Sequence, residues 1–321
     1  MHRKIDDTPE FRKRANGSIG KQSGPLNRLK AANDTVDETR SLLPYGRGNV
    51  VEDNKRTHYE SSRRDEAVMH MLNENSPKGD DPKQLTAAMF RFAKAARCGG
   101  SAPIATHLHG NKLKGNYRAN TVELDRVDHT HTEVTRGNVR RQNDPIIDAW
   151  LDGPAVLRED ARYGKSDGKA IHQLDEITGP EAARNVERIS ARLEADPHQK
   201  NLLKYYIGTG EFDYHSDGYK RYATEFYSRS VYNEDFQIEA GKALHGLSGH
   251  SSMIRKSKPA TLAQEIQAVG VALSLNGGLA SVSPDGAHAA GSSQSGKIRN
   301  ALAEAPGIIE SAKRQFPPQN Y

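Results

Sequence analysis

The stretch Ala95-Ala96-Arg97-Cys98-Gly99-Gly100-Ser101-Ala102-Pro103 decides how this chain is interpreted, because it contains the one cysteine among 321 residues. Proline is tolerated in the first turn of a helix, so Pro103 is compatible with a short helix from Ser101 to about His109. Cys98 would then lie where this helix begins. The unpaired N–H groups and partial positive charge of a helix N-terminus favour the thiolate form of a cysteine.

A histidine and an aspartate follow this cysteine at spacings that suit a nucleophile and its activating groups. His129 comes 31 residues later in Val127-Asp128-His129-Thr130-His131-Thr132-Glu133-Val134, and Asp148 comes another 19 residues on in Asp144-Pro145-Ile146-Ile147-Asp148-Ala149-Trp150. A thiolate nucleophile needs a base to take its proton, and that base needs a carboxylate to orient it. The order Cys98, His129, Asp148 therefore predicts a catalytic triad.

Strand signals surround the last two of these residues. Apolar residues alternate over Asn120–Val127, β-branched residues dominate His129–Thr135, and Pro145–Leu151 is nearly all apolar, as in a buried strand. Cross-strand neighbours lie about 5 Å apart in an antiparallel pair. Adjacent strands would therefore bring His129 and Asp148 side by side.

Neighbouring polar residues offer alternatives within the same site. His131 has the same parity as His129 along a strand, so it faces the same side and is an alternative base. Glu133 shares that face, where it either hydrogen-bonds within the site or is solvated. Asp144 directly precedes Pro145, which favours a role in a turn over a role in the triad.

Other chemistry is less well supported by the sequence. A lone cysteine is most often an inert buried side chain, so its spacing from His129 alone is weak support for catalysis. Cys98, His107, His109 and His131 lack the tight pairing of a Cys/His zinc site, and no metal is predicted. Tyr163-Gly164-Lys165-Ser166 resembles the end of a phosphate-binding loop, but Glu159 occupies the required upstream glycine position.

The composition indicates an ordered core with additional polar segments. Hydrophobic residues make up 35% of the chain, the mean hydropathy is −0.80, and the net charge is a modest +5. Such a balance is typical of a solvated surface rather than of nucleic-acid binding. A single cysteine cannot form an internal disulfide, which favours a reducing compartment, and no apolar run approaches the roughly 18 residues of a membrane span.

Three regions are predicted along the chain. Residues 1–61 are basic and without periodicity, which predicts a disordered secretion or targeting leader. Residues 62–165 are predicted to form the catalytic core. Residues 166–321 are predicted to form a mostly helical lobe with a flexible loop at 276–296. The predicted helices span Arg63–Asn75, a segment starting near Pro82, Pro180–Ala195, and about 198–207, 217–231, 234–245, 260–275 and 297–314.

Aromatic residues concentrate in the predicted lobe. Residues 205–236 hold ten of the twenty aromatic side chains, interleaved with lysines and arginines. Such a stretch can stack nucleic-acid bases. The helical spacing of Tyr219, Tyr222 and Phe226 instead favours a packed core or a surface that recognises a target protein.

Three blocks of this sequence resemble a family of bacterial proteins. Arg97-Cys98-Gly99-Gly100-Ser101-Ala102, Asp128-His129-Thr130-His131-Thr132-Glu133 and Asp148-Ala149-Trp150-Leu151-Asp152-Gly153-Pro154-Ala155-Val156 resemble the HopX/AvrPphE/XopE family of type III secreted effectors of plant pathogens. The resemblance is strongest over about 85–165. Some relatives begin with Met-Gly for acylation, but His2 follows Met1 here, so membrane anchoring by that route is not expected.

The resemblance implies an α+β fold with a transglutaminase-like (papain-like) core, in which the helix carrying the cysteine packs on a small antiparallel sheet, followed by a mostly helical lobe. It implies that Cys98 is the nucleophile, His129 the base and then the acid, and Asp148 the residue that orients the imidazole. No cofactor is required. Protease-like hydrolysis of host plant proteins is favoured, with glutamine deamidation or transglutamination as alternatives. Delivery through the type III secretion machinery into the host cytoplasm is expected, with the nucleus or membrane periphery also possible destinations.

A different class of function also fits the sequence. In that interpretation the triad is vestigial and the chain is a non-enzymatic effector whose helical lobe binds a host protein.

Overall fold

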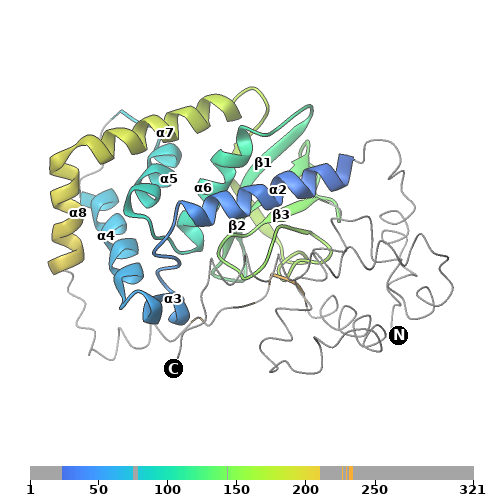
Figure 1. The fold of residues 1–321 in the computed structure, drawn as a ribbon. Helices are drawn as coiled ribbons and strands as arrows, with labels where there is room; N and C mark the ends of the chain where they lie inside the picture. The colour runs from blue at the N-terminus through green and yellow to red at the C-terminus, as the bar shows by residue number, and fades with distance from the viewer. Residues whose placement is uncertain are drawn as a thin grey trace, which may run out of the picture. The chain divides into compact units, whose positions relative to one another are not determined.

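The computed structural model describes residues 24–74, 79–142, 144–209, 226, 229 and 231–233 (Figure 1). These residues fall into two compact units. One comprises Ala31–Val156 and Lys165–Val231, and it contains the triad candidates. The other comprises Met1–Lys30, Leu157–Gly164 and Tyr232–Tyr321. Within the described part of that second unit, Ala161 pairs with Tyr232 in an isolated antiparallel bridge.

The site-bearing unit contains a small sheet on one side of its helices (Figure 1). Its strands are β1 (Tyr117–Leu124), β2 (Thr130–Arg136), β3 (Pro145–Ile147), β4 (Val156–Leu157) and β5 (Gly168–Leu174), in the order β4-β3-β2-β1-β5. The pairs β1–β2, β1–β5 and β2–β3 are antiparallel. The predictions of a mixed α+β fold and of a small antiparallel sheet are therefore confirmed.

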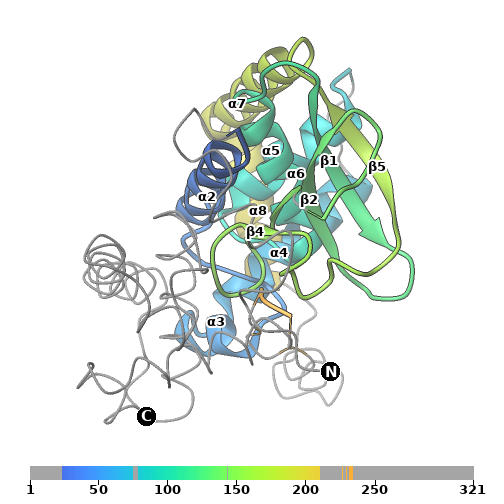
Figure 2. The ribbon, with the colours of Figure 1, turned by 90° about the vertical axis from the view of Figure 1, so that its right-hand side faces the viewer.

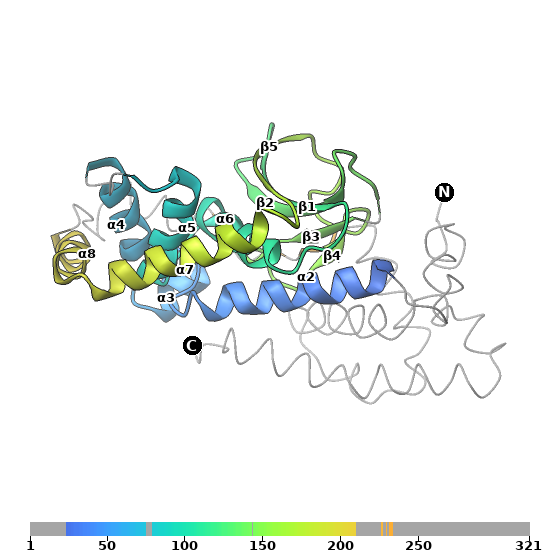
Figure 3. The same cartoon turned by 90° about the horizontal axis from the view of Figure 1, so that it is seen from above.

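Helix α6 (Cys98–Gly110) packs against β1 and β2 on one side and against α5 (Pro82–Ala93) and α7 (Gly179–Ala195) on the other. Figures 2 and 3 show this helix between the sheet and α5. A chain of hydroxyl groups joins it to the strands: Thr106 Oγ1 lies 2.8 Å from Thr121 Oγ1 and 2.9 Å from Thr132 Oγ1. Thr132 in turn donates to the Ala102 carbonyl at 2.9 Å. These buried bonds fix the helix against both strands.

The helical layer is built as the apolar periodicity predicts. Asp81 caps α5 by accepting hydrogen bonds from the N–H groups of Lys83 and Gln84, and Pro82 occupies the first turn. Helices α4 (Glu60–Glu74) and α8 (Pro197–Thr209) complete the layer. The side chains of its core include Ala67, Val68, Met71, Leu85, Ala88, Met89, Phe92, Val186, Ile189 and Leu193.

The structure differs from the predicted leader over residues 24–61. Two helices lie there, α2 (Gly24–Ser41) and α3 (Val51–Arg56), and the loop between them is largely buried. Apolar periodicity does not reveal α2 because polar side chains help to anchor it, as when Thr35 Oγ1 bonds to His109 Nδ1 at 3.0 Å. Order therefore begins well before the predicted core.

The structure also differs at the boundary predicted between the core and the helical lobe. Strand β5 (Gly168–Leu174) falls in the region predicted to be helical, yet it pairs with β1 along the sheet edge. An edge strand exposes much of its surface, so it does not need the apolar alternation that predicts a half-buried strand. The helices predicted after it at Pro180–Ala195 and 198–207 correspond to α7 and α8.

Several predictions fall on other parts of the chain. Residues 1–23 of the predicted leader, the loop at 276–296 and the helices at 234–245, 260–275 and 297–314 lie outside the described residues, as does most of the helix at 217–231. Across the described ranges, no helix combines the length and apolar character needed to span a membrane.

Candidate active site

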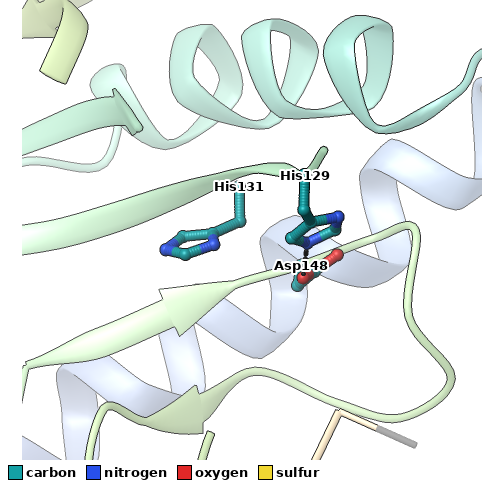
Figure 4. A group of neighbouring side chains, drawn as sticks. All are labelled: His129, His131 and Asp148. Carbon is teal, nitrogen blue, oxygen red and sulfur yellow. Dashed lines mark hydrogen bonds and ion pairs between the residues drawn. The ribbon is translucent and has the colours of Figure 1, made fainter. Parts of the chain in front are cut away.

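The three triad candidates come from three different elements. Cys98 is the first residue of α6, His129 directly precedes β2, and Asp148 directly follows β3. Because β2 and β3 are antiparallel, with Thr132 opposite Ile147, the start of one strand lies beside the end of the other. The cross-strand placement of His129 and Asp148 expected from the sequence is what the sheet produces (Figure 4).

A short hydrogen bond joins the histidine to the aspartate. His129 Nε2 lies 2.6 Å from Asp148 Oδ2, and both side chains are buried. The other oxygen, Asp148 Oδ1, accepts hydrogen bonds from the backbone N–H groups of Trp150 and Leu151, each at 3.1 Å. The carboxylate is thereby held on both oxygens, and its orientation toward the imidazole is fixed.

The surroundings of His129 keep it positively charged. Burial by itself lowers the pKa of His129, but the charge and hydrogen bond of Asp148, followed by a hydrogen bond and the charge of Cys98, raise the pKa to about 10. Burial raises the pKa of Asp148, but the charge and hydrogen bond of His129 hold it below its ordinary value. Cys98, His129 and Asp148 therefore form one electrostatically coupled group.

The nitrogen that His129 presents to Cys98 follows from these contacts. Its Nε2 is engaged by Asp148 at 2.6 Å, so Nδ1 is the nitrogen that remains for the thiol. A doubly protonated imidazole donates from both nitrogens. One proton then faces the carboxylate and the other faces the sulfur.

The two glycines after Cys98 have opposite surroundings. A Cβ on Gly99 would meet nothing within 4 Å, and this residue is exposed, whereas the neighbouring Cys98 is buried, with 7% of its surface exposed. A Cβ on Gly100 would lie 2.6 Å from Cγ of Phe90. Gly100 therefore lets the first turn of α6 pack closely onto α5, whereas Gly99 faces open space next to the buried cysteine.

The start of α6 is held by charged groups. Arg97 precedes the helix in an extended conformation. Its backbone N–H donates to Asp65 Oδ1 at 2.8 Å, and its Nε donates to Asp65 Oδ2 at 2.5 Å. Its guanidinium also pairs with Glu66. The N–H groups of Gly100 and Ser101 both donate to the Arg97 carbonyl. The N–H groups of Cys98 and Gly99 are thus the first donors of the helix, with no intrahelical acceptor.

Two arginines clamp the loop that carries Asp148, and sequence reasoning missed both. Arg40 on α2 donates to the carbonyl oxygens of Ala149 at 3.3 Å and Leu151 at 2.6 Å. Arg47 donates through Nη1 to the Trp150 carbonyl and through Nε to Asp53 Oδ2, both at 2.8 Å. The three carbonyl partners are more than 100 residues away along the chain, so no local sequence signal identifies these bonds.

An aromatic wall flanks the imidazole. The Trp150 ring centroid lies 5.3 Å from that of His129, and Phe226 meets Trp150 edge to face. Trp150 Nε1 donates to Asn49 Oδ1 at 2.8 Å, which fixes the indole. The loop containing Asn49 is therefore part of the site, and no motif in the sequence marks it.

Of the other residues considered from the sequence, two lie in the site and three have separate structural contacts. His131 Nε2 bonds to Glu133 Oε1 at 3.1 Å, so both belong to the site, with ring centroids of the two histidines 5.8 Å apart. Asp144 accepts from the Arg141 N–H at 2.7 Å, which confirms its role in a turn. His107 bonds to the Pro103 carbonyl at 2.8 Å, and His109 bonds to Thr35, with burial lowering the pKa of each to about 4.

No family model, curated protein or solved structure matches this chain. The interpretation of the site therefore rests on its geometry and on the chemistry of the residues that the fold brings together.

Proposed function

We propose that this protein is a cysteine hydrolase that attacks amide carbonyls of proteins, with Cys98 as nucleophile, His129 as acid and base, and Asp148 as the residue that orients the imidazole. The observation that carries the proposal is the buried His129, whose Nε2 bonds to Asp148 and whose pKa is raised by Asp148 and by Cys98. A buried imidazolium beside a thiol at a helix N-terminus is the environment that activates a sulfur nucleophile.

The first half of the proposed reaction forms a thioester. The Cys98 sulfur attacks the amide carbonyl carbon, and the developing oxyanion is stabilised by the N–H groups of Cys98 and Gly99 at the start of α6. The C–N bond then breaks as His129 gives its Nδ1 proton to the departing nitrogen. An amine leaves, and the acyl group remains on sulfur.

The second half releases the acyl group. Water replaces the amine, His129 takes one of its protons, and the resulting oxygen attacks the thioester carbonyl. The C–S bond breaks, and the thiolate and imidazolium are restored. Asp148 keeps the imidazole oriented through both halves because its two oxygens are held by His129 and by backbone N–H groups.

The open space at Gly99, directly after the buried Cys98, supports a large substrate. Gly99 is exposed and a Cβ there would meet nothing within 4 Å, so we propose that an extended peptide segment lies over Gly99 to reach the sulfur. We propose a transglutaminase-like (papain-like) core for this arrangement of helix and antiparallel sheet. The resemblance of the three triad blocks to plant-pathogen effectors supports a type III effector that acts on host plant proteins.

The test compares the full chain with Cys98→Ala on a plant protein extract. Proteomics of both samples should reveal new peptide termini only with the unmodified protein. If glutamine residues are converted to glutamate instead, the activity is deamidation. If isopeptide links form instead, the activity is transglutamination. If the two samples are indistinguishable while both proteins are folded, the enzymatic proposal is wrong and the chain is a binding effector.

A further inference from the structure

His131 carries a buried nitrogen that the proposed hydrolysis does not use. Its side chain is 1% exposed, and its Nε2 lies 3.1 Å from Glu133 Oε1. The second oxygen of Glu133 pairs with Arg140 Nε at 2.8 Å, so the carboxylate is ionised and acts only as an acceptor. Nε2 of His131 therefore donates to this carboxylate, and Nδ1 is the ring nitrogen that Glu133 does not engage.

This second nitrogen lies beside the triad. Within the described part of the chain, His131 Nδ1 has no hydrogen-bond partner. Figure 4 shows one ring nitrogen of His131 on the side that faces His129 and Asp148. One donor atom of each of these three buried residues lies within 4.8 Å of those of the other two. Two imidazoles and a carboxylate thus converge at one point of the buried site.

We propose that His129, His131 and Asp148 form a Zn²⁺ site that switches off Cys98. Two imidazole nitrogens and one carboxylate oxygen are a ligand set that zinc binds with a water as fourth ligand. Zinc bonds of about 2.0–2.2 Å place the ligand atoms of a tetrahedral site a little over 3 Å apart. Small side-chain movements within the 4.8 Å group provide that spacing.

The groups behind the ligands are arranged as in zinc proteins. A metal-binding histidine usually donates its other ring N–H to a carboxylate, which fixes the tautomer. Glu133 supplies this carboxylate to His131 and is itself held by Arg140. Asp148 Oδ1 is held by two backbone N–H groups, so Oδ2 is the oxygen that turns to the ion.

Zinc binding would remove the function of His129. The ion replaces the proton that Nε2 shares with Asp148, and that proton passes to solvent. The ring then has only its Nδ1 proton, and giving this proton to a leaving amine would produce an imidazolate. This inhibition rests on the proposed hydrolysis, whereas the zinc site itself does not.

Calorimetric titration of the full chain with ZnCl₂ tests the site. We expect one Zn²⁺ to bind per chain, with affinity weakened more than about 100-fold by His131→Ala and about 10–100-fold by Glu133→Gln, which removes only a supporting group. Cys98→Ser should bind zinc as the unmodified protein does. His198→Ala, which changes an exposed histidine on α8, is the matched control.

Three results would overturn the zinc site. These are an absence of stoichiometric binding, binding that survives both His131→Ala and Glu133→Gln, and binding lost in Cys98→Ser, which would place zinc on the thiol.

The rate of Cys98 alkylation, measured with and without zinc, tests whether zinc switches off the cysteine. Slower alkylation in the unmodified chain, with no change in Glu133→Gln at the same zinc concentration, supports the switch, and equal slowing in both contradicts it. An unreactive Cys98 in zinc-free protein refutes the hydrolase without affecting the calorimetric result.

Discussion

Arg47 Nη1 donates to the Trp150 carbonyl oxygen at 2.8 Å, across 103 residues of chain. This bond connects the loop between α2 and α3 to the loop that carries Asp148. Burial lowers the pKa of Arg47, but Asp53 and Asp152 raise it above its ordinary value, so the guanidinium stays charged. The triad is therefore braced from a region that the composition presents as a polar leader.

Breaking this brace should destabilise the fold. We expect Arg47→Met to lower the free energy of unfolding by about 3–5 kcal/mol, because it leaves Asp53 as a buried charge without its main partner. Arg188→Met, at an exposed position of α7, is the control and should change stability by less than about 0.5 kcal/mol. Urea denaturation measures both, and equal effects would show that the brace contributes nothing.

The charge on His129 should make Cys98 reactive in mildly acidic solution. We expect iodoacetamide to alkylate Cys98 near pH 6 more than about tenfold faster than a free cysteine, because the raised pKa of His129 keeps a cation beside the sulfur. His129→Ala should abolish the enhancement and Asp148→Asn should reduce it. Mass spectrometry follows the reaction, and an ordinary rate in the unmodified chain would contradict an activated thiol.

The same histidine should make stability depend on pH in the alkaline range. The pKa of His129 is raised from 6.5 to about 10 in the folded chain, so the protonated form stabilises the fold. This contribution is complete below about pH 6.5 and disappears as the pH rises through about 10. Unfolding midpoints of the unmodified chain and of His129→Gln should therefore converge across this interval. Parallel curves would show that His129 has no raised pKa.

The two glycines after Cys98 should respond oppositely to a methyl group. Gly100→Ala should cost about 1–3 kcal/mol of stability, because its Cβ would overlap the Phe90 ring. Gly99→Ala should keep or slightly raise stability because its Cβ meets nothing within 4 Å. Thermal unfolding distinguishes them. A decrease in hydrolysis by folded Gly99→Ala would locate the substrate at this open side, and unchanged hydrolysis would argue against that approach.

The hydroxyl chain between α6 and the sheet should also contribute to stability. Thr106→Val keeps the side-chain shape but removes the oxygen shared by Thr121 and Thr132. Leaving these buried hydroxyls short of a partner should cost about 1–3 kcal/mol. Thr86→Val on α5, whose hydroxyl bond is exposed, is the matched control. Equal denaturation midpoints for the two variants would show that the chain does not hold α6 in place.

The parts of the fold that the sequence predicts are those with local signals. The proline in the first turn of α5 and the apolar stripe of α7 set these helices, and the β-branched residues of 130–135 set β2. The edge strand β5 and helix α2 were not predicted because their stability depends on pairing and polar bonds with distant segments. Their own residues have no clear apolar period.

Local sequence by itself determined which residues are available for chemistry: one cysteine, a histidine and an aspartate at the ends of short strands. Only the tertiary structure decided how they are used. It placed Nε2 of His129 against Asp148, engaged His131 with Glu133, and left Nδ1 of His131 beside the triad. The reason is that spacing along a chain limits which side chains can meet, whereas the orientation of a ring nitrogen and its charge depend on every group packed around it.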